Sequence, residues 1–173
     1  MNLLNNISSR NSNVSCKTLI KLLSKQRKGL NIVHINAQSL VNKMDEFRFI
    51  FENSGTNIIC ISETWFDKIM PGSLFALSGY KLDRESHAGG VAIFIRNCIP
   101  CKLNCKSTDN SAIEYIFVEI MSNSEILPVG VVYGPKRKKL LYDQIACPIC
   151  SKHDLIFLTY DFKFSRCNET FFL

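Results

Sequence analysis

Long apolar runs, repeats and several familiar catalytic signatures are missing from this chain of 173 residues. No run of 18 apolar residues occurs, so the sequence predicts no membrane-spanning helix and no membrane partner. The first ten residues, MNLLNNISSR, lack the apolar centre of a secretory signal peptide, so we expect an intracellular protein, with the nucleus as a candidate compartment. A Walker loop, GxSxG and HExxH are also absent, which disfavours P-loop hydrolases, serine hydrolases and zinc peptidases of those types.

Composition and charge are those of one globular domain with a moderate basic excess. Hydrophobic residues make up 46% of the chain and charged residues 21%, which is enough apolar material for a core. The formal net charge of +6 permits an anionic partner such as nucleic acid. The basic run 136–139 is a solvated turn in the simpler interpretation and a phosphate contact in the other.

Eight cysteines leave two interpretations open. Cys98, Cys101 and Cys105 lie close together, and Cys147 with Cys150 forms a CxxC, so two pairs of thiolates could bind zinc. The spacing after Cys101 is irregular, and these segments look like neighbouring loops. Reduced, unpaired thiols are therefore the interpretation that we favour.

The chain divides into an Asn- and Ser-rich segment, 1–28, predicted to be disordered or weakly helical, and a domain over 29–173. Residues 30–36 form a β-branched run typical of a core strand, and 58–61 form a second one. Between them Ser39 is predicted to cap a helix. Its buried face is predicted by the spacing of Leu40, Met44, Phe47 and Phe51. Strand, helix, strand is an α/β beginning.

The later strands are predicted at 80–82, 91–96, 113–120, 127–133 and 155–158. We expect the middle three, 91–96, 113–120 and 127–133, to form an antiparallel meander, with the last of them broken at Pro128. A further helix is predicted over 140–145.

Four predicted strands end in a polar or hydroxyl-bearing residue: Asn36, Glu63, Tyr133 and Asp161. A sandwich that gathers its strand ends at one mouth would bring these side chains together. Two carboxylates, an amide and a phenol suit a hard divalent cation and a phosphate. For Glu63 alone, the simpler interpretation is a solvated glutamate at the start of a loop.

Six short motifs carry a family resemblance. They are INAQSL at 35–40, ISETWF at 61–66, GY at 79–80, GGVAIFIRN at 89–97, VVYGP at 131–135 and LTYDF at 158–162. In this order and at these distances the chain, over about residues 30–164, resembles endonuclease/exonuclease/phosphatase domains. It is most similar to the apurinic-like endonuclease domain of non-LTR (LINE-type) retrotransposons. Each motif is weak alone, and the order of all six makes the resemblance specific.

The resemblance implies a four-layer α/β sandwich of the DNase I-like type and hydrolysis of phosphodiester or phosphate bonds with Mg²⁺ or Mn²⁺. It implies that Glu63 is the principal metal ligand and that Asn36 orients phosphate or metal-bound water. By the same resemblance, Tyr133 would hydrogen-bond a phosphate oxygen, and Asp161 would orient or activate the attacking water. Lys163 stands where the family has a phosphate-binding Asn, and it could itself contact the substrate.

Three departures from the family weaken the expected activity. Lys163 replaces an Asn, and an ammonium ~4 Å from a cation repels it by about 4 kcal/mol at an effective dielectric near 20. Tyr160 replaces a glycine. The family's late Ser-Asp-His motif does not occur in the chain, so we expect a C-terminally truncated domain without its general acid–base help, a loss of about 10²- to 10⁴-fold.

The sequence therefore predicts a DNA-nicking, Mg²⁺-dependent endonuclease domain of retrotransposon type, weak or inactive in this chain. A reverse transcriptase region is the expected neighbour if the gene continues. Two alternatives stay open: a phosphoesterase of the same fold that acts on a substrate other than nucleic acid, and a non-catalytic nucleic-acid-binding remnant.

Overall fold

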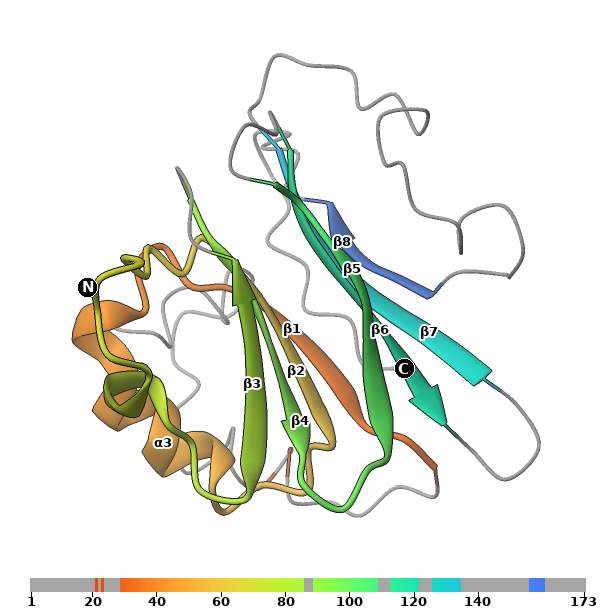
Figure 1. Ribbon diagram of the computed structural model, residues 1–173. Coiled ribbons are helices and arrows are strands. Elements are labelled where there is room, and N and C mark those ends of the chain that lie inside the picture. The colour runs from red at the N-terminus through yellow and green to blue at the C-terminus, as the bar shows by residue number, and fades with distance from the viewer. Residues whose placement is uncertain are drawn as a thin grey trace.

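A helix and two four-stranded sheets make up the described part of the computed structural model, which covers residues 21, 23, 29–85, 89–108, 113–121, 126–134 and the backbone of 156–160 (Figure 1). The first sheet has the strand order β1-β2-β4-β3, and the second has the order β5-β6-β7-β8. No helix of the described residues is long and apolar enough to cross a membrane.

The elements follow the chain in a simple order. The first sheet is formed by β1 (Ile32–Asn36), β2 (Ile58–Ser62), β3 (Tyr80–Glu85) and β4 (Val91–Arg96). The second is formed by β5 (Cys101–Lys106), β6 (Glu114–Met121), β7 (Ile126–Tyr133) and β8 (Ile156–Tyr160). The helical elements are η1 (Val41–Lys43), α3 (Met44–Phe51) and η2 (Gly72–Phe75).

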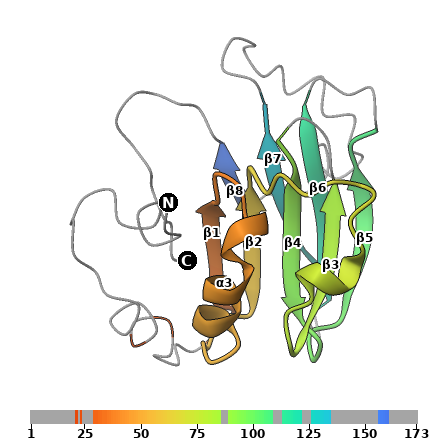
Figure 2. The same ribbon diagram turned by 90° about the vertical axis from the view of Figure 1, so that its left-hand side faces the viewer.

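The first sheet is buried on both faces because its central strands are apolar at every position before their last residues, Ser62 and Arg96. Val33, Ile59 and Phe94 pack toward α3, while Ile58, Cys60 and Ile93 pack toward the second sheet. Figure 2 shows α3 lying across β1 and β2. Side chains that alternate between two apolar environments produce a continuous hydrophobic run, which is why 58–61 was predictable as a buried strand.

The helix packs on the first sheet through the face that its spacing predicts. Leu40, Met44, Phe47 and Phe51 are all buried, and the ring of Phe47 lies 4.8 Å from that of Phe51 and 5.1 Å from that of Phe94. Burying one such ring stabilises the fold by about 1.5–3 kcal/mol. The α/β sandwich predicted from the sequence is confirmed. Three of its four expected layers are α3, the first sheet and the second sheet, and no helix covers the outer face of the second sheet among the described residues.

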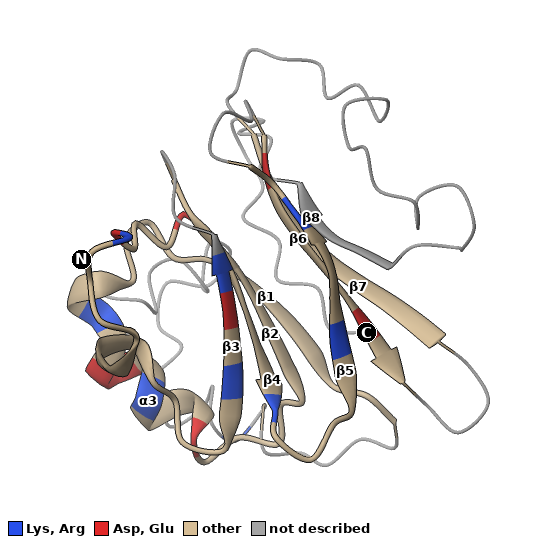
Figure 3. Cartoon of the chain, in the orientation of Figure 1, with Lys and Arg blue, Asp and Glu red and all other residues tan. Residues whose placement is uncertain are grey.

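Charged side chains are unevenly distributed over these layers. In Figure 3 the strands β1, β2 and β7 carry no Lys, Arg, Asp or Glu, whereas α3 and the edge strand β3 carry several. Charges on an edge strand oppose pairing with another sheet.

Three details of the predicted secondary structure are wrong. The helix cap is one of them, because η1 begins after Leu40 with no side-chain cap and Ser39 has a left-handed backbone with φ +73. The meander is another, since β4 pairs with β2 and β3, and only β6 and β7 pair with each other as expected. The third is Pro128, which does not break β7; it lies before Val129, where pairing with β8 begins.

A strand also occurs where loops were expected. β5 carries Cys101 and Cys105 and pairs with β6 through a register shift between Leu103 and Cys105. The predicted helix at 140–145 lies outside the described residues. In the N-terminal segment, Lys21 and Leu23 are helical, and Leu23 packs into the core beside α3.

Candidate functional site

The carboxyl ends of β1 and β2 place two predicted site residues at one edge of the first sheet. The two strands are parallel, and Asn36 pairs with Ser62, the residue before Glu63. Glu63 is buried, with 8% of its surface exposed, and the Oδ1 of Asn36 accepts a hydrogen bond from the Gln38 backbone at 3.2 Å. The sequence therefore placed Asn36 and Glu63 correctly at adjoining strand ends.

The two loops that continue from these strands remain hydrogen-bonded to each other. Ala37 N donates to Ser62 O, Ser39 N to Glu63 O and Leu40 N to Thr64 O, each at 2.9 Å. Parallel pairing of the backbone thus continues past the end of the sheet. This pairing fixes the position of Glu63 relative to the loop after Asn36.

The same two loops contain every non-glycine residue with positive φ in the described part of the chain. They are Gln38 (φ +45), Ser39 (φ +73), Glu63 (φ +55) and Trp65 (φ +57). Non-glycine residues seldom adopt this conformation, and each costs of order 1–3 kcal/mol that the surrounding structure must offset. Clustered strain of this kind is typical of functional sites, which strengthens the case against Glu63 as an ordinary solvated loop residue.

A glycine turn before β4 joins the Glu63 loop to the second sheet. Gly90 O accepts from Thr64 N at 3.1 Å, and Gly89 O accepts from Trp65 N at 2.8 Å. A Cβ added to Gly89 would lie 2.3 Å from Cε1 of Tyr133, so the phenol ring rests directly on this turn. Tyr133, the last residue of β7, therefore lies at the same end of the sandwich as Glu63, as predicted.

Glu114 is a site component that the sequence interpretation did not assign. It begins β6 opposite Tyr133 and is 5% exposed. Its carboxylate accepts hydrogen bonds from Gly90 N at 2.6 Å and from Gly89 N at 3.4 Å. The sequence did contain a signal for Glu114, because it alternates with Ile116 and Val118 and so faces inward. A carboxylate that is buried in this way needs hydrogen-bond donors.

His34, in the middle of β1, lies beneath this end of the sheet and is packed in the core, with 5% of its surface exposed. Burial lowers the pKa of His34 to about 3, so the imidazole is neutral at pH 7. Its Nε2 lies 3.2 Å from Oγ of Ser62, the residue that precedes Glu63. A neutral, fully packed ring supports the β1–β2 pairing and is a poor general base.

The donor set at the strand ends suits magnesium better than zinc. No group of three or more His, Cys, Asp or Glu able to hold a metal occurs among the described residues. Mg²⁺ needs only one or two carboxylates, because water and substrate phosphate complete its shell, so Glu63 with Asn36 is compatible with it. Cys60, Cys98 and Cys101, in the described part, are free thiols. Burial raises the pKa of Cys60 to about 12, so this thiol is unreactive.

The other predicted site residues follow β7 and β8 in the chain. β8 runs parallel to β7 and ends at Tyr160, beside Val132, so it ends at the same side as Tyr133. Asp161, Lys163, the side chain of Tyr160, the basic run 136–139 and the pair Cys147 and Cys150 lie outside the described residues. Their roles stay predictions.

Comparison with known proteins gives a likeness of structure alone. No family model and no curated protein sequence matches the chain. Among solved structures, D. rerio TDP2 complexed with a single-strand DNA product aligns with 65% of this chain and 49% of its own, at 10% identity and a TM-score of 0.43. The human Nocturnin catalytic domain with bound sulfate aligns over 64% and 51%, at 14% identity and TM-score 0.41.

An AP endonuclease from Archaeoglobus fulgidus is a third such structure, with 62% of this chain and 41% of its own aligned, 18% identity and a TM-score of 0.40. All three are endonuclease/exonuclease/phosphatase-fold proteins, and the chain spans about half of their length. At such identities the likeness concerns the arrangement of the sheets alone.

Proposed function

We propose that this chain is a DNA-nicking phosphodiesterase domain of retrotransposon type, dependent on Mg²⁺ or Mn²⁺ and slow. The observation that supports it best is the meeting of Glu63, Asn36 and Tyr133 at one end of the sandwich, on loops with strained backbone. The order of the six sequence motifs supports the retrotransposon lineage, including a reverse transcriptase region as its neighbour. The basic excess of +6 supports DNA as the substrate.

Each residue has a defined part in this proposal. Glu63 would hold the cation, which supplies positive charge against the scissile phosphate when it is bound. Asn36 would orient the phosphate or a metal-bound water. Tyr133 would donate its phenolic hydrogen to a phosphate oxygen. Asp161 would orient the attacking water, and Lys163 would contact a phosphate of the DNA backbone. Without a Ser-Asp-His motif in these 173 residues, we expect nicking slower by at least roughly 10² than in a domain that has one.

Nicking of supercoiled plasmid with Mg²⁺ tests the activity, with Glu63→Gln as the inactive variant. Glu46→Gln is the matched control, because Glu46 lies on α3, on the far face of the first sheet from β6 and β7. We expect slow nicking by the wild type and by Glu46→Gln, and at least about 10²-fold less by Glu63→Gln. Equal nicking by all three proteins would show a contaminating nuclease and would refute the assignment.

Calorimetry with Mg²⁺ gives a second readout that does not depend on turnover. We expect Glu63→Gln to lose binding that Glu46→Gln keeps. Hydrolysis of a simple phosphate monoester without plasmid nicking would favour the non-nucleic-acid phosphoesterase. DNA binding with neither Mg²⁺ binding nor hydrolysis would favour the non-catalytic remnant.

A further inference from the structure

Trp65 is an exposed indole at the edge of the candidate site. It is the single tryptophan of the chain, and 57% of its surface is exposed. Large hydrophobic side chains are exposed elsewhere in the described part, among them Phe49 on α3. Trp65 differs from them because it lies on a loop that carries a predicted metal ligand, two residues after Glu63.

The backbone beneath this indole is fixed by its neighbours on both sides. Trp65 has φ +57 and donates its N–H to Gly89 O at 2.8 Å. Thr64 before it is fully buried, and Phe66 after it is buried and stacks on Phe75 at 3.8 Å between ring centroids. An exposed aromatic residue between two buried anchors is preorganised, so little conformational entropy remains to be lost when a ligand binds.

The turn that accepts the Trp65 N–H also contacts the ring of Tyr133, so the exposed indole and the candidate phosphate-binding phenol are held by the same turn. A nucleotide presents this same pair of features, an aromatic base joined through a sugar to a phosphate. Single-stranded nucleic acids are commonly bound by aromatic side chains that stack on bases beside a groove for the backbone.

We propose that Trp65 stacks on an unpaired nucleobase of single-stranded DNA whose backbone phosphate lies at the Glu63 end of the sandwich. This inference rests on the proposed function and adds a contact with the base to it. Because every base has an aromatic face, the contact is tolerant of sequence, and its strength depends little on salt.

Intrinsic fluorescence tests this contact directly, because Trp65 is the only tryptophan. The protein is titrated, without added Mg²⁺, with a 12-nucleotide single strand and with an abasic strand of equal length and charge. We expect the normal strand to quench the emission and the abasic strand to leave it almost unchanged. Fluorescence anisotropy of the labelled strands measures affinity independently.

Substitutions then separate stacking from charge. Trp65→Ala is expected to weaken binding of the normal strand by roughly 5- to 150-fold, the range that corresponds to a stacking loss of about 1–3 kcal/mol, and to leave abasic-strand binding unchanged. Trp65→Phe should recover much of the affinity. Phe49→Ala is the matched control, an equally exposed aromatic residue (58%) on α3, and should change nothing.

Equal affinity of wild type and Trp65→Ala for the normal strand would overturn the stacking proposal and leave the proposed function standing. Equal quenching by the normal and abasic strands would also overturn it, because the indole would then sense the backbone. Failure of the wild type to bind either strand, with no plasmid nicking, would overturn both proposals together.

Discussion

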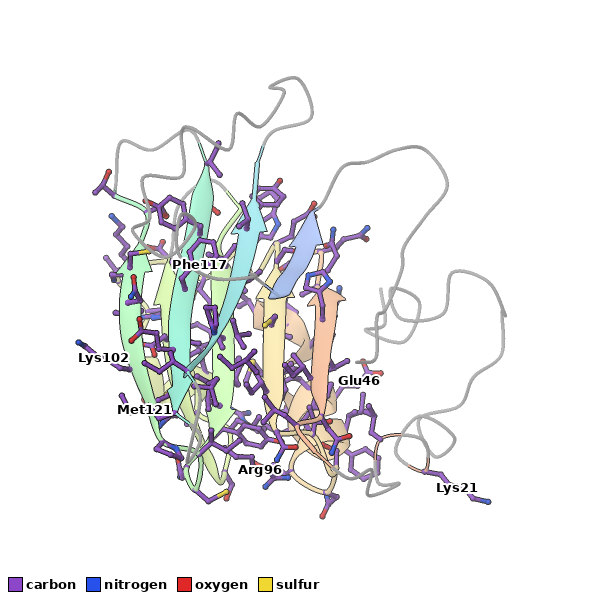
Figure 4. All side chains as sticks on the ribbon, turned by 90° about the vertical axis from the view of Figure 1, so that its right-hand side faces the viewer. Lys21, Glu46, Arg96, Lys102, Phe117 and Met121 are labelled. Carbon is purple, nitrogen blue, oxygen red and sulfur yellow. The ribbon has the colours of Figure 1, made fainter. Side chains whose placement is uncertain are left out.

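The two ends of the first sheet are held together in contrasting ways. At the site end, the loops after β1 and β2 and the turn before β4 are joined mainly by backbone hydrogen bonds, with Glu114 as the bridge to the second sheet. At the other end, where Figure 4 labels Arg96, side-chain hydrogen bonds add to backbone ones such as those from Arg96 N to Asn57 O and from Asn57 N to Asn31 O. Arg96 donates to Ser54 O at 2.5 Å and to Thr56 O at 3.1 Å.

The Arg96 end also satisfies its polar groups without backbone strain. The Tyr80 hydroxyl donates to Thr56 O at 2.7 Å, and the Arg96 guanidinium lies 4.4 Å from the centre of the Tyr80 ring. None of the positive-φ residues other than glycine in the described part occurs there. The Arg96 end therefore contributes stability to the fold. At the site end the loops have a strained backbone, and the packing of the core beneath must offset its cost.

The largest expected effect is on the site end in acid. Because burial lowers the pKa of His34 to about 3, the unfolded chain takes up its proton near pH 6.5 and the folded chain does not. The folded state therefore has its full stability above pH 6.5. As the pH falls from there toward 3, the free energy of unfolding decreases by up to about 1.4 kcal/mol per pH unit. Urea unfolding of wild type and His34→Gln at several pH values measures this loss. Between pH 7 and pH 4 the free energy of unfolding should fall by about 3 kcal/mol more in the wild type than in the variant. Equal falls in the two proteins would contradict the prediction.

Breaking the Arg96 end should cost stability and spare the site. Arg96→Ala removes two hydrogen bonds from a charged donor and the contact with the Tyr80 ring, so we expect the free energy of unfolding to fall by about 2 kcal/mol. Arg96→Lys should lose less stability, because the lysine ammonium can still donate a hydrogen bond to one of the two carbonyl oxygens. Denaturant unfolding measures this loss, and Mg²⁺ binding by the folded variants should be unchanged. A loss of Mg²⁺ binding would show that the two ends are coupled.

Weakening the hydrogen bonds of Glu114 at the site end should affect the site more than the stability of the fold. Glu114→Gln replaces a charged acceptor of the Gly89 and Gly90 amides by a neutral one, at a cost of about 1 kcal/mol in stability. Since this turn positions the Glu63 loop and Tyr133, we expect weaker Mg²⁺ binding and slower nicking than in Arg96→Lys, although the latter is similarly stable. Equal site properties in the two variants would remove Glu114 from its positioning role.

The smallest expected effect measures the strain itself. Gln38 is exposed and has φ +45, a conformation that glycine adopts without steric cost. Gln38→Gly should therefore be more stable than Gln38→Ala by up to about 1 kcal/mol, because both lose the side chain and only alanine keeps the strain. Thermal unfolding of the pair is the measurement. A more stable alanine variant would mean that this loop is not strained.

Much of the fold was predictable because its signals are local. The runs that became β1, β2, β4 and β8 are apolar and β-branched, and the spacing of Leu40, Met44, Phe47 and Phe51 defined the buried face of α3. β5 was missed because it is an edge strand with a register shift and no clear alternation. Asn36, Glu63 and Tyr133 were found because each stands where an apolar run stops.

By itself, the sequence determined most of the segments that form strands and the polar residues Asn36, Glu63 and Tyr133 that stand where three of them stop. An apolar run and its interruption are properties of consecutive residues. Only the tertiary structure decided that β4 joins β2 and β3, that Glu114 reaches across to Gly89 and Gly90, and that Gln38, Ser39, Glu63 and Trp65 adopt left-handed backbone. Those features depend on partners far apart in the chain, and pairing between distant segments leaves no periodic trace in either of them.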